Sequence, residues 1–295
     1  MRMHIGHVAL QVTDIERSAE HAARTLGLRE SKRTVGQSLL SANAKHHELQ
    51  LIASDRAGLD HIGLELEDKR DLEQLRDRLT SAGVTILSSK PEEDGLDEAF
   101  RCVAPAGVVF EIYTGMERAP LSLQNVLGPF ARKLGHVTLF SDQKDALEQF
   151  ILELLGFKVS DRFGELGTWM RCDADHHGLS VGMTPSGTRL NHYAFEFENL
   201  AAIGAYADHL ARDGQHLLRG PGRHGPGFNI FTYLRDPEGA IIETYADMIR
   251  INDDASYRPL DWSSDPRAMN LWGQGPPEGW DQLGVPVLSP SSSGP

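Results

Sequence analysis

The chain has 295 residues, of which 40% are hydrophobic and 24% are charged, so it can form one large domain or two ordinary ones with real cores. No stretch approaches 18 uncharged apolar residues and the start of the chain does not have the pattern of a signal peptide, so we expect no membrane span and a cytoplasmic protein. The net charge is −13 and the Lys and Arg residues are scattered, which argues against nucleic acid and anionic membranes as partners.

The predicted elements repeat in the same order in the two halves. From Gly6 the chain reads Gly-His-Val, alternates like a half-buried strand, continues as a helix to Leu-Gly and enters a second strand. Strands from His46 and Asp60, an amphipathic helix over 72–83 that ends at glycine, and a strand over 105–113 follow. Segments that start at 135, 176, 191, 203 and 237 repeat these patterns. We therefore predict a duplicated α+β fold with two β-α-β-β-β modules in each half.

The duplication predicts the domain boundaries. An N-terminal domain is expected over residues 1–118, a linker over 119–132, and a C-terminal domain over 133–250. A Trp- and Pro-rich extension follows over residues 251–282, and this extension could act as a lid. Residues 283–295 have the composition of a disordered tail.

Three residues of the second half could hold a metal ion. The two cysteines lie in different halves, so a metal site must use His and carboxylate ligands. His136 begins the first strand of the second half, and His192 and Glu243 lie on strands of alternating pattern. Two neutral imidazoles and one carboxylate on one side of an ion leave positions open, which suits Fe(II) and also Mn(II). From spacing alone, two structural histidines and a surface glutamate remain the alternative.

Five segments of the second half carry a family resemblance. They are GHV, DHH, NHYAFEF, GRHGPG and FTYLRDPEGAIIETY, in this order. Together they resemble the type I extradiol dioxygenases of the vicinal oxygen chelate superfamily, over Gly6 to about Trp272. The resemblance implies paired βαβββ modules, two per domain, that form two incomplete mixed-sheet barrels. It also implies a homo-oligomer, most simply a tetramer, that binds Fe(2+) or alternatively Mn(2+).

The resemblance also implies roles for individual residues. His136, His192 and Glu243 match the metal ligands of the family, and His177 matches its acid/base histidine. His224 and Tyr233 match the pair that hydrogen-bonds the substrate oxygen. The implied reaction is the cleavage of a catecholic ring beside its two hydroxyl groups, with both atoms of O₂ incorporated.

Two further residues are weaker candidates for substrate binding. Trp169 lies eight residues before His177 and resembles a pocket-wall aromatic, although a plain core role is as reasonable. Arg219 could bind a substrate carboxylate or merely support its loop. Arg267 and Trp272 could belong to a lid over the second-half cavity.

The first half repeats the metal trio as His7, His61 and Glu111. However, Arg101 stands at the position of Tyr233, and nothing matches the GRHGPG segment, so we expect no working metal site there. Two other functions compete with ring cleavage. A glyoxalase-like enzyme and a non-catalytic protein that binds a metal or a small aromatic ligand could use the same modules.

Overall fold

The computed structural model describes residues 1–118 and 130–288, and each half of the chain builds one mixed sheet. The first half contains β1 (Met3–Val12), α1 (Ile15–Leu26), β2 (Arg29–Arg33), β3 (Gln37–Ser41), β4 (Leu49–Ala53), β5 (Gly58–Leu66), α2 (Lys69–Ser81), β6 (Ile86–Ser88), β7 (Leu96–Val103) and β8 (Val109–Met116). The second half contains β9 (Lys133–Ser141), α3 (Lys144–Gln149), the π-helix η3 (Phe150–Leu154), β10 (Lys158–Phe163), β11 (Gly167–Arg171), β12 (Leu179–Met183), β13 (Arg189–Glu196), α4 (Leu200–Arg212), β14 (Arg219–Arg223), β15 (Ile230–Arg235) and β16 (Ile241–Ala246).

The two sheets have the same topology. The first runs β2-β3-β4-β1-β5-β8-β7-β6, and the second runs β10-β11-β12-β9-β13-β16-β15-β14, with two short additional strands. In both sheets the first strand pairs in parallel with the fourth and antiparallel with the fifth. The predicted α+β fold of duplicated βαβββ modules, two in each half, is therefore confirmed.

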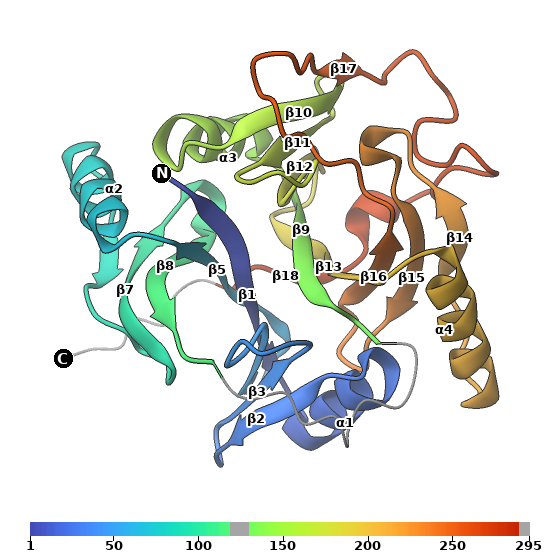
Figure 1. Cartoon of the computed structure of the whole chain (residues 1–295), viewed down its shortest axis with the longest axis horizontal. Coiled ribbons are helices and arrows are strands. Elements are labelled where there is room, and N and C mark those ends of the chain that lie inside the picture. Colours follow the sequence, from blue (N-terminus) through green and yellow to red (C-terminus); the bar gives the residue numbers. More distant parts are fainter. Residues whose placement is uncertain (119–129, 289–295) are drawn as a thin grey trace.

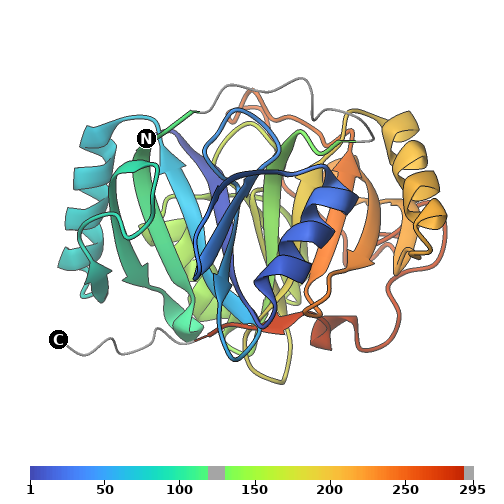
Figure 2. The same cartoon turned by 90° about the horizontal axis from the view of Figure 1, so that it is seen from below.

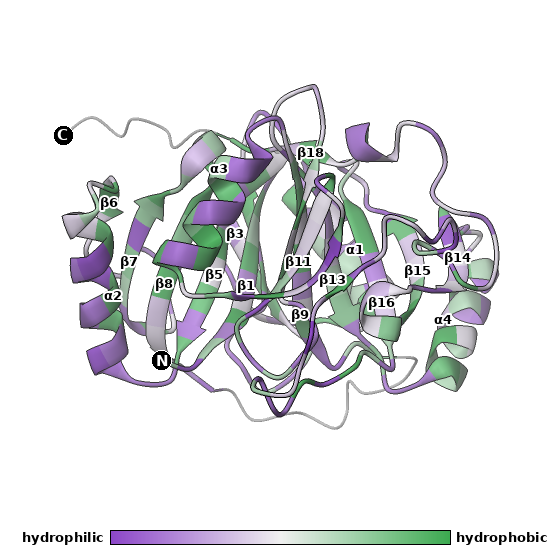
Figure 3. Cartoon of the chain, turned by 90° about the horizontal axis from the view of Figure 1, so that it is seen from above, coloured by the Kyte–Doolittle hydropathy of each residue, from purple (hydrophilic) through white to green (hydrophobic). Residues whose placement is uncertain are grey.

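Local sequence explains where the helices begin and end. The side chains of Asp14, Asp68 and Asn199 each accept a hydrogen bond from a backbone N–H of the first turn that follows. Helix α1 ends at Gly27, which adopts a left-handed conformation with φ of 69°. The helices turn hydrophilic residues outward and hydrophobic residues towards the sheets (Figure 3). Helices α2 and α4 lie at opposite ends of the molecule (Figure 1 and Figure 2).

The two halves share one continuous hydrophobic core, with β1 and β9 side by side at its centre (Figure 1). The prediction of a disordered tail over residues 283–295 is wrong for residues 283–288, which are held in the structure. They include β18 (Val285–Pro286), which pairs with β13, and Val287, which bridges to Leu59 of β5. Leu288 is buried, so the burial of apolar side chains explains why this segment is held. Residues 289–295 lie outside the described part of the chain.

Most of the predicted linker, residues 119–129, also lies outside the described residues. The predicted extension, 251–282, runs along the second sheet, where β17 (Leu260–Asp261) pairs with β10 and extends the sheet edge. Among the residues that the structure describes, none of the helices has the length and apolar character needed to cross a bilayer.

Candidate metal centre

Three neighbouring strands bring His136, His192 and Glu243 together. In the register of the sheet, Ala194 of β13 pairs with His136 of β9 on one side and with Glu243 of β16 on the other. His192 lies two residues before Ala194, on the same face of β13. The small side chain at position 194 leaves space between the larger groups. The sequence-predicted trio is thus a consequence of strand order and register.

The geometry of the trio fits a divalent metal ion. Glu243 Oε2 lies 3.1 Å from His136 Nε2 and 3.0 Å from His192 Nε2. Ligand atoms that each lie roughly 2.1 Å from one ion, at right angles, are about 3 Å apart. All three side chains are buried, which is costly for a carboxylate without a positive partner. The donor set of two nitrogens and one oxygen suits Fe(II) or Mn(II).

The surroundings favour the protonation states of His192 and Glu243 that metal binding needs. Burial lowers the pKa of His192, which favours the neutral imidazole. Burial alone would raise the pKa of the Glu243 carboxyl, but the neighbouring rings of His136 and His192 hold it well below its usual range. A neutral imidazole and an ionised carboxylate are the forms that bind a cation.

Neighbouring residues that we did not predict from the sequence orient the ligands. Asn191 Oδ1 accepts a hydrogen bond from His192 Nδ1 at 2.7 Å, which leaves Nε2 free to bind a metal. Asn229 Nδ2 donates to Glu243 Oε1 at 3.0 Å. Gly135 precedes His136 because a Cβ there would lie 1.7 Å from the Tyr245 hydroxyl oxygen. Asn191 lay within the NHYAFEF segment, whereas nothing local in the sequence marked Asn229.

The second group of predicted residues lies beside the trio. The rings of His177 and His136 are 4.5 Å apart, and Tyr233 of β15 pairs in register with Glu243. His224 Nδ1 donates to the Met269 carbonyl at 3.1 Å, so its Nε2 accepts a hydrogen bond from the Tyr233 hydroxyl at 3.0 Å.

Burial shifts the acidity of all three residues. It lowers the pKa of His177 well below its usual value and that of His224 to about 4, and it raises the pKa of Tyr233 well above 10. All three groups are therefore neutral near pH 7. A neutral His177 can accept a proton, and a neutral Tyr233 can donate a hydrogen bond to a developing oxyanion.

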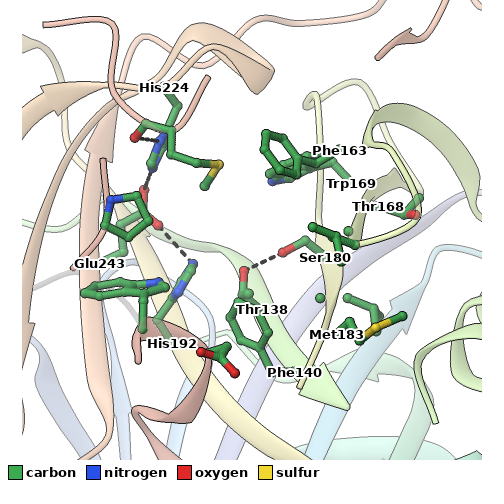
Figure 4. Close-up of a pocket in the computed structure, with 18 of the residues that line it drawn as sticks. Thr138, Phe140, Phe163, Thr168, Trp169, Ser180, Met183, His192, His224 and Glu243 are labelled. Carbon is green, nitrogen blue, oxygen red and sulfur yellow. Dashed lines mark hydrogen bonds and ion pairs between the residues drawn. The ribbon is translucent and has the colours of Figure 1, made fainter. Parts of the chain in front are cut away.

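These groups face a cavity of about 390 Å³. His192, His224 and Glu243 lie on one side of it, and Phe163, Trp169 and Met183 face them from the other (Figure 4). Its apolar wall is formed by Phe140, Phe163, Leu166, Trp169, Val181, Met183, Met269, Pro276, Pro277 and Trp280. No Lys or Arg is among the described residues that line the cavity, so its chemistry favours an uncharged aromatic molecule.

The two weaker candidates for substrate binding, Trp169 and Arg219, differ in whether they line the cavity. Trp169 lines the cavity. Arg219 is not among the lining residues: its guanidinium packs 4.7 Å from the Phe231 ring and 5.5 Å from the Trp280 ring, and it donates to the Met269 carbonyl at 2.8 Å. The position of Arg219 therefore favours support of the cavity wall over contact with substrate.

The extension covers the cavity with residues other than those we singled out. Met269, Pro276, Pro277 and Trp280 line it. Trp272 is 50% exposed and stacks on the guanidinium of Arg223, and Arg267 forms an exposed ion pair with Asp265. The signal that could have found the lining residues was the Pro- and Trp-rich composition itself.

The first half contains a second buried cluster of His and Glu, but an arginine lies within it. His7, His61 and Glu111 come together as the repeat predicts, with Glu93 as an unpredicted fourth member. Arg101 donates to Glu111 Oε1 at 2.9 Å and to Glu93 Oε1 at 2.7 Å. A guanidinium thus supplies positive charge to both carboxylates.

Comparisons with known proteins agree with this geometry. The family model described as the Glyoxalase/Bleomycin resistance protein/Dioxygenase superfamily matches residues 4–112 and 133–244. A manganese-dependent 2,3-dihydroxybiphenyl 1,2-dioxygenase of Geobacillus genomosp. 3 is 29% identical over 92% of this chain and 93% of its own length. An iron-dependent extradiol dioxygenase of Rhodococcus jostii is 24% identical over 91% and 95%.

Solved structures agree on the fold. A Mn(II)-bound glyoxalase from Novosphingobium aromaticivorans superimposes with a TM-score of 0.86 at 26% identity, over 98% of this chain and 97% of that one. Homoprotocatechuate 2,3-dioxygenase from Brevibacterium fuscum superimposes with a TM-score of 0.88 at 23% identity, over 98% and 94%. The predicted family resemblance and the predicted fold are both confirmed.

Proposed function

The chain belongs to the glyoxalase/bleomycin resistance protein/dioxygenase superfamily, and from this premise we infer that it is an extradiol ring-cleaving dioxygenase. It is an oxidoreductase that incorporates both atoms of O₂ into a catecholic ring. The observation that supports this best is the open face of the trio. His136, His192 and Glu243 meet at one wall of a cavity with room for an aromatic ring, and His177, His224 and Tyr233 line the same cavity.

The trio would hold Fe(II), or Mn(II) as the alternative, and relatives named for each metal support both. When bound, the ion supplies a Lewis acid for the two vicinal hydroxyls and an electron path from the ring to O₂. His177 is positioned to accept a proton and later return it. The Tyr233 hydroxyl, 3.0 Å from His224 Nε2, has one proton, which it can turn from that ring to a substrate oxygen when one is bound.

The cavity supports a substrate with an apolar substituent. Its lining contains aromatic and aliphatic side chains, whereas its charged members are Glu243 and Asp281, which are acidic. A substrate carboxylate would lie near these acids without a basic partner among the described lining residues. We therefore favour an uncharged catechol such as 2,3-dihydroxybiphenyl over 3,4-dihydroxyphenylacetate. We also propose that the protein is cytoplasmic and, on the family resemblance alone, that it is a homo-oligomer, most simply a tetramer.

The test is oxygen uptake by metal-loaded protein. The protein is loaded with Fe(II) or Mn(II) without oxygen, mixed in air with 2,3-dihydroxybiphenyl or 3,4-dihydroxyphenylacetate, and followed by O₂ consumption and the yellow colour of the ring-opened product. We expect turnover with a higher kcat/KM for 2,3-dihydroxybiphenyl. Glu243→Gln should abolish turnover, whereas the same change in the first copy, Glu111→Gln, should retain it.

Two results would contradict the proposal. Binding of the catechol without O₂ uptake would indicate a binding protein. Turnover of a glutathione hemithioacetal without O₂ uptake would indicate a glyoxalase-type enzyme, the second candidate, which the similarity to the N. aromaticivorans structure makes worth testing.

A further inference from the structure

Two hydroxyl groups contact each other on the floor of the cavity, the side that the second sheet forms. We propose that Thr138 and Ser180 form a subsite that hydrogen-bonds a neutral oxygen atom on the substrate ring, such as an ether or a third hydroxyl. The substrate class is then an uncharged catechol that carries one further oxygen. The proposal rests on the proposed function, because the metal-binding trio must first hold the catechol.

Strand register places the hydroxyl pair beside a metal ligand. Thr138 of β9 pairs with His192 of β13 on one side and with Ser180 of β12 on the other. Ser180 in turn pairs with Trp169 of β11. Residues that pair directly across neighbouring strands point to the same face, and the row spans three strand spacings, roughly 14 Å. A catechol that is held by the trio and reaches towards Trp169 therefore passes the two hydroxyls.

The neighbours along β9 bound the pair on both sides. His136 lies two residues before Thr138 and Phe140 lies two residues after it, on the same face of the strand. The Phe140 ring covers Gly182, since a Cβ at that glycine would lie 2.4 Å from a ring carbon. The pair is therefore a polar site between a metal ligand and an apolar surface. A methoxy group would match both, with its oxygen at the pair and its methyl group against Phe140.

The pair has one proton to give to a ligand. Thr138 Oγ1 and Ser180 Oγ are 2.6 Å apart, so one hydroxyl donates to the other (Figure 4). Within residues 1–118 and 130–288, neither oxygen has another hydrogen-bond partner. Two hydroxyls carry two protons and this bond uses one, so the second can be donated to an oxygen in the cavity. Thr138 is 8% and Ser180 5% exposed, and a buried donor without a partner is costly.

Thr168, another hydroxyl residue of the cavity lining, shows the contrast. Its hydroxyl donates to Glu148 Oε2 at 2.9 Å and accepts from Arg162 Nη1 at 3.0 Å. Neither of these partners is among the described residues that line the cavity. The Thr168 hydroxyl is thus used on the side away from the cavity, whereas the Thr138 and Ser180 pair keeps a donor for a ligand.

The first copy of the repeat has the same row of residues without the hydroxyls. Ala9 pairs with His61 and with Gln50, so Ala9 and Gln50 stand at the positions of Thr138 and Ser180. Gln50 Nε2 donates to Gln37 Oε1 at 3.0 Å. The fold therefore forms without a hydroxyl pair at this place. The pair occurs in the copy whose trio faces the cavity, as expected of a ligand-binding feature.

The experiment compares two ligands that differ by one oxygen. The two molecules, 3-methoxycatechol and 3-ethylcatechol, are similar in size, but only the first carries an ether oxygen. Their dissociation constants are measured by calorimetry on Fe(II)-loaded protein without O₂, so that no turnover occurs. The preference for 3-methoxycatechol, defined as the ratio of the two constants, should fall by about two- to tenfold in the double variant Thr138→Val/Ser180→Ala. Either single variant should lose less, because the remaining hydroxyl keeps a proton for the ligand.

Thr168→Val is the matched control. It removes a hydroxyl from the cavity lining whose hydrogen bonds point away from the cavity, so the preference should stay unchanged. Replacing both members of a hydrogen-bonded pair by apolar groups of similar shape is nearly neutral for stability, so the double variant should fold and load metal as the parent does.

The outcomes separate the subsite from the proposed function. An equal preference in the parent and the double variant, or an equal loss in Thr168→Val, would overturn the proposal. An unchanged preference with a higher KM for O₂ would also overturn it and would assign the pair to O₂ instead. If neither catechol binds to the metal-loaded parent, the proposed function fails and the subsite fails with it. If both bind and the double variant does not change the preference, only the subsite fails.

Discussion

Replacing Arg101 by methionine should destabilise the fold strongly without affecting the metal centre. The Arg101 side chain is 13% exposed and donates to two carboxylates, Glu93 and Glu111, whose side chains are 1% and 0% exposed. Removing one partner of a buried ion pair costs about 3–5 kcal/mol. Glu93 keeps a charged partner, because Glu93 and Asp60 outweigh the effect of burial and raise the pKa of His61 to about 9. The loss in the free energy of unfolding therefore comes mainly from the Glu111 carboxylate, which is left unpaired. We expect the lower end of the range, about 3 kcal/mol.

Urea unfolding near pH 7.5, followed by tryptophan fluorescence, measures this loss as a change in the free energy of unfolding. Arg70→Met is the matched control, since Arg70 forms its ion pair within the described part of the chain with the exposed Asp68, and it should leave the unfolding transition unchanged. Adding Glu111→Gln to Arg101→Met should recover part of the stability, because it removes the unpaired charge. A loss below about 1 kcal/mol for Arg101→Met, or a double variant less stable than the single one, would refute the charge argument.

Three further predictions concern the second half. His177→Phe should lower kcat by about 10²–10⁴-fold at unchanged metal content, and wild-type turnover in a metal-replete variant would contradict its role as base. Asn229→Ala removes the amide that orients Glu243, so chelator competition should show metal affinity reduced by about 10–100-fold, and equal affinity would count against this support. Burial raises the pKa of Asp236 from 3.8 to about 7, so its contribution to stability is present below pH 3.8 and is lost as the pH rises towards 7. Urea titrations should therefore show a steeper fall in stability from pH 4 to pH 7 in the parent than in Asp236→Asn, and parallel curves would contradict this.

The duplication made much of the fold and the trio predictable. A repeat of strand and helix patterns constrains topology, because equivalent segments must bury equivalent faces. Strand spacing placed His136, His192 and Glu243 on the faces of regular strands, and the family resemblance singled them out among the other His and Glu residues. In the structure the three residues lie on adjacent strands in matching register.

Other parts of the site depend on contacts that no local pattern encodes. Asn229 reaches Glu243 of β16 from the residue before β15. Residues 285–288 fell within the predicted disordered tail, but they pair with β13 and β5 and bury Leu288. Hydrogen-bond partners and tail packing are set by tertiary structure, so they required coordinates.

The two copies differ in how each balances its buried negative charge. In the second copy the ligand carboxylate is Glu243, and the neutral Asn191 receives the His192 Nδ1 proton. In the first copy Asp60 stands at the position of Asn191, with its Oδ1 atom 2.7 Å from His61 Nδ1, and Arg101 stands at the position of Tyr233. A carboxylate in place of an amide favours a charged imidazole, which cannot donate a lone pair to a metal. The first copy is thus neutralised by its own side chains, whereas the second needs an external cation. It follows that a chelator should lower the stability of the metal-loaded protein through the second cluster and not through the first.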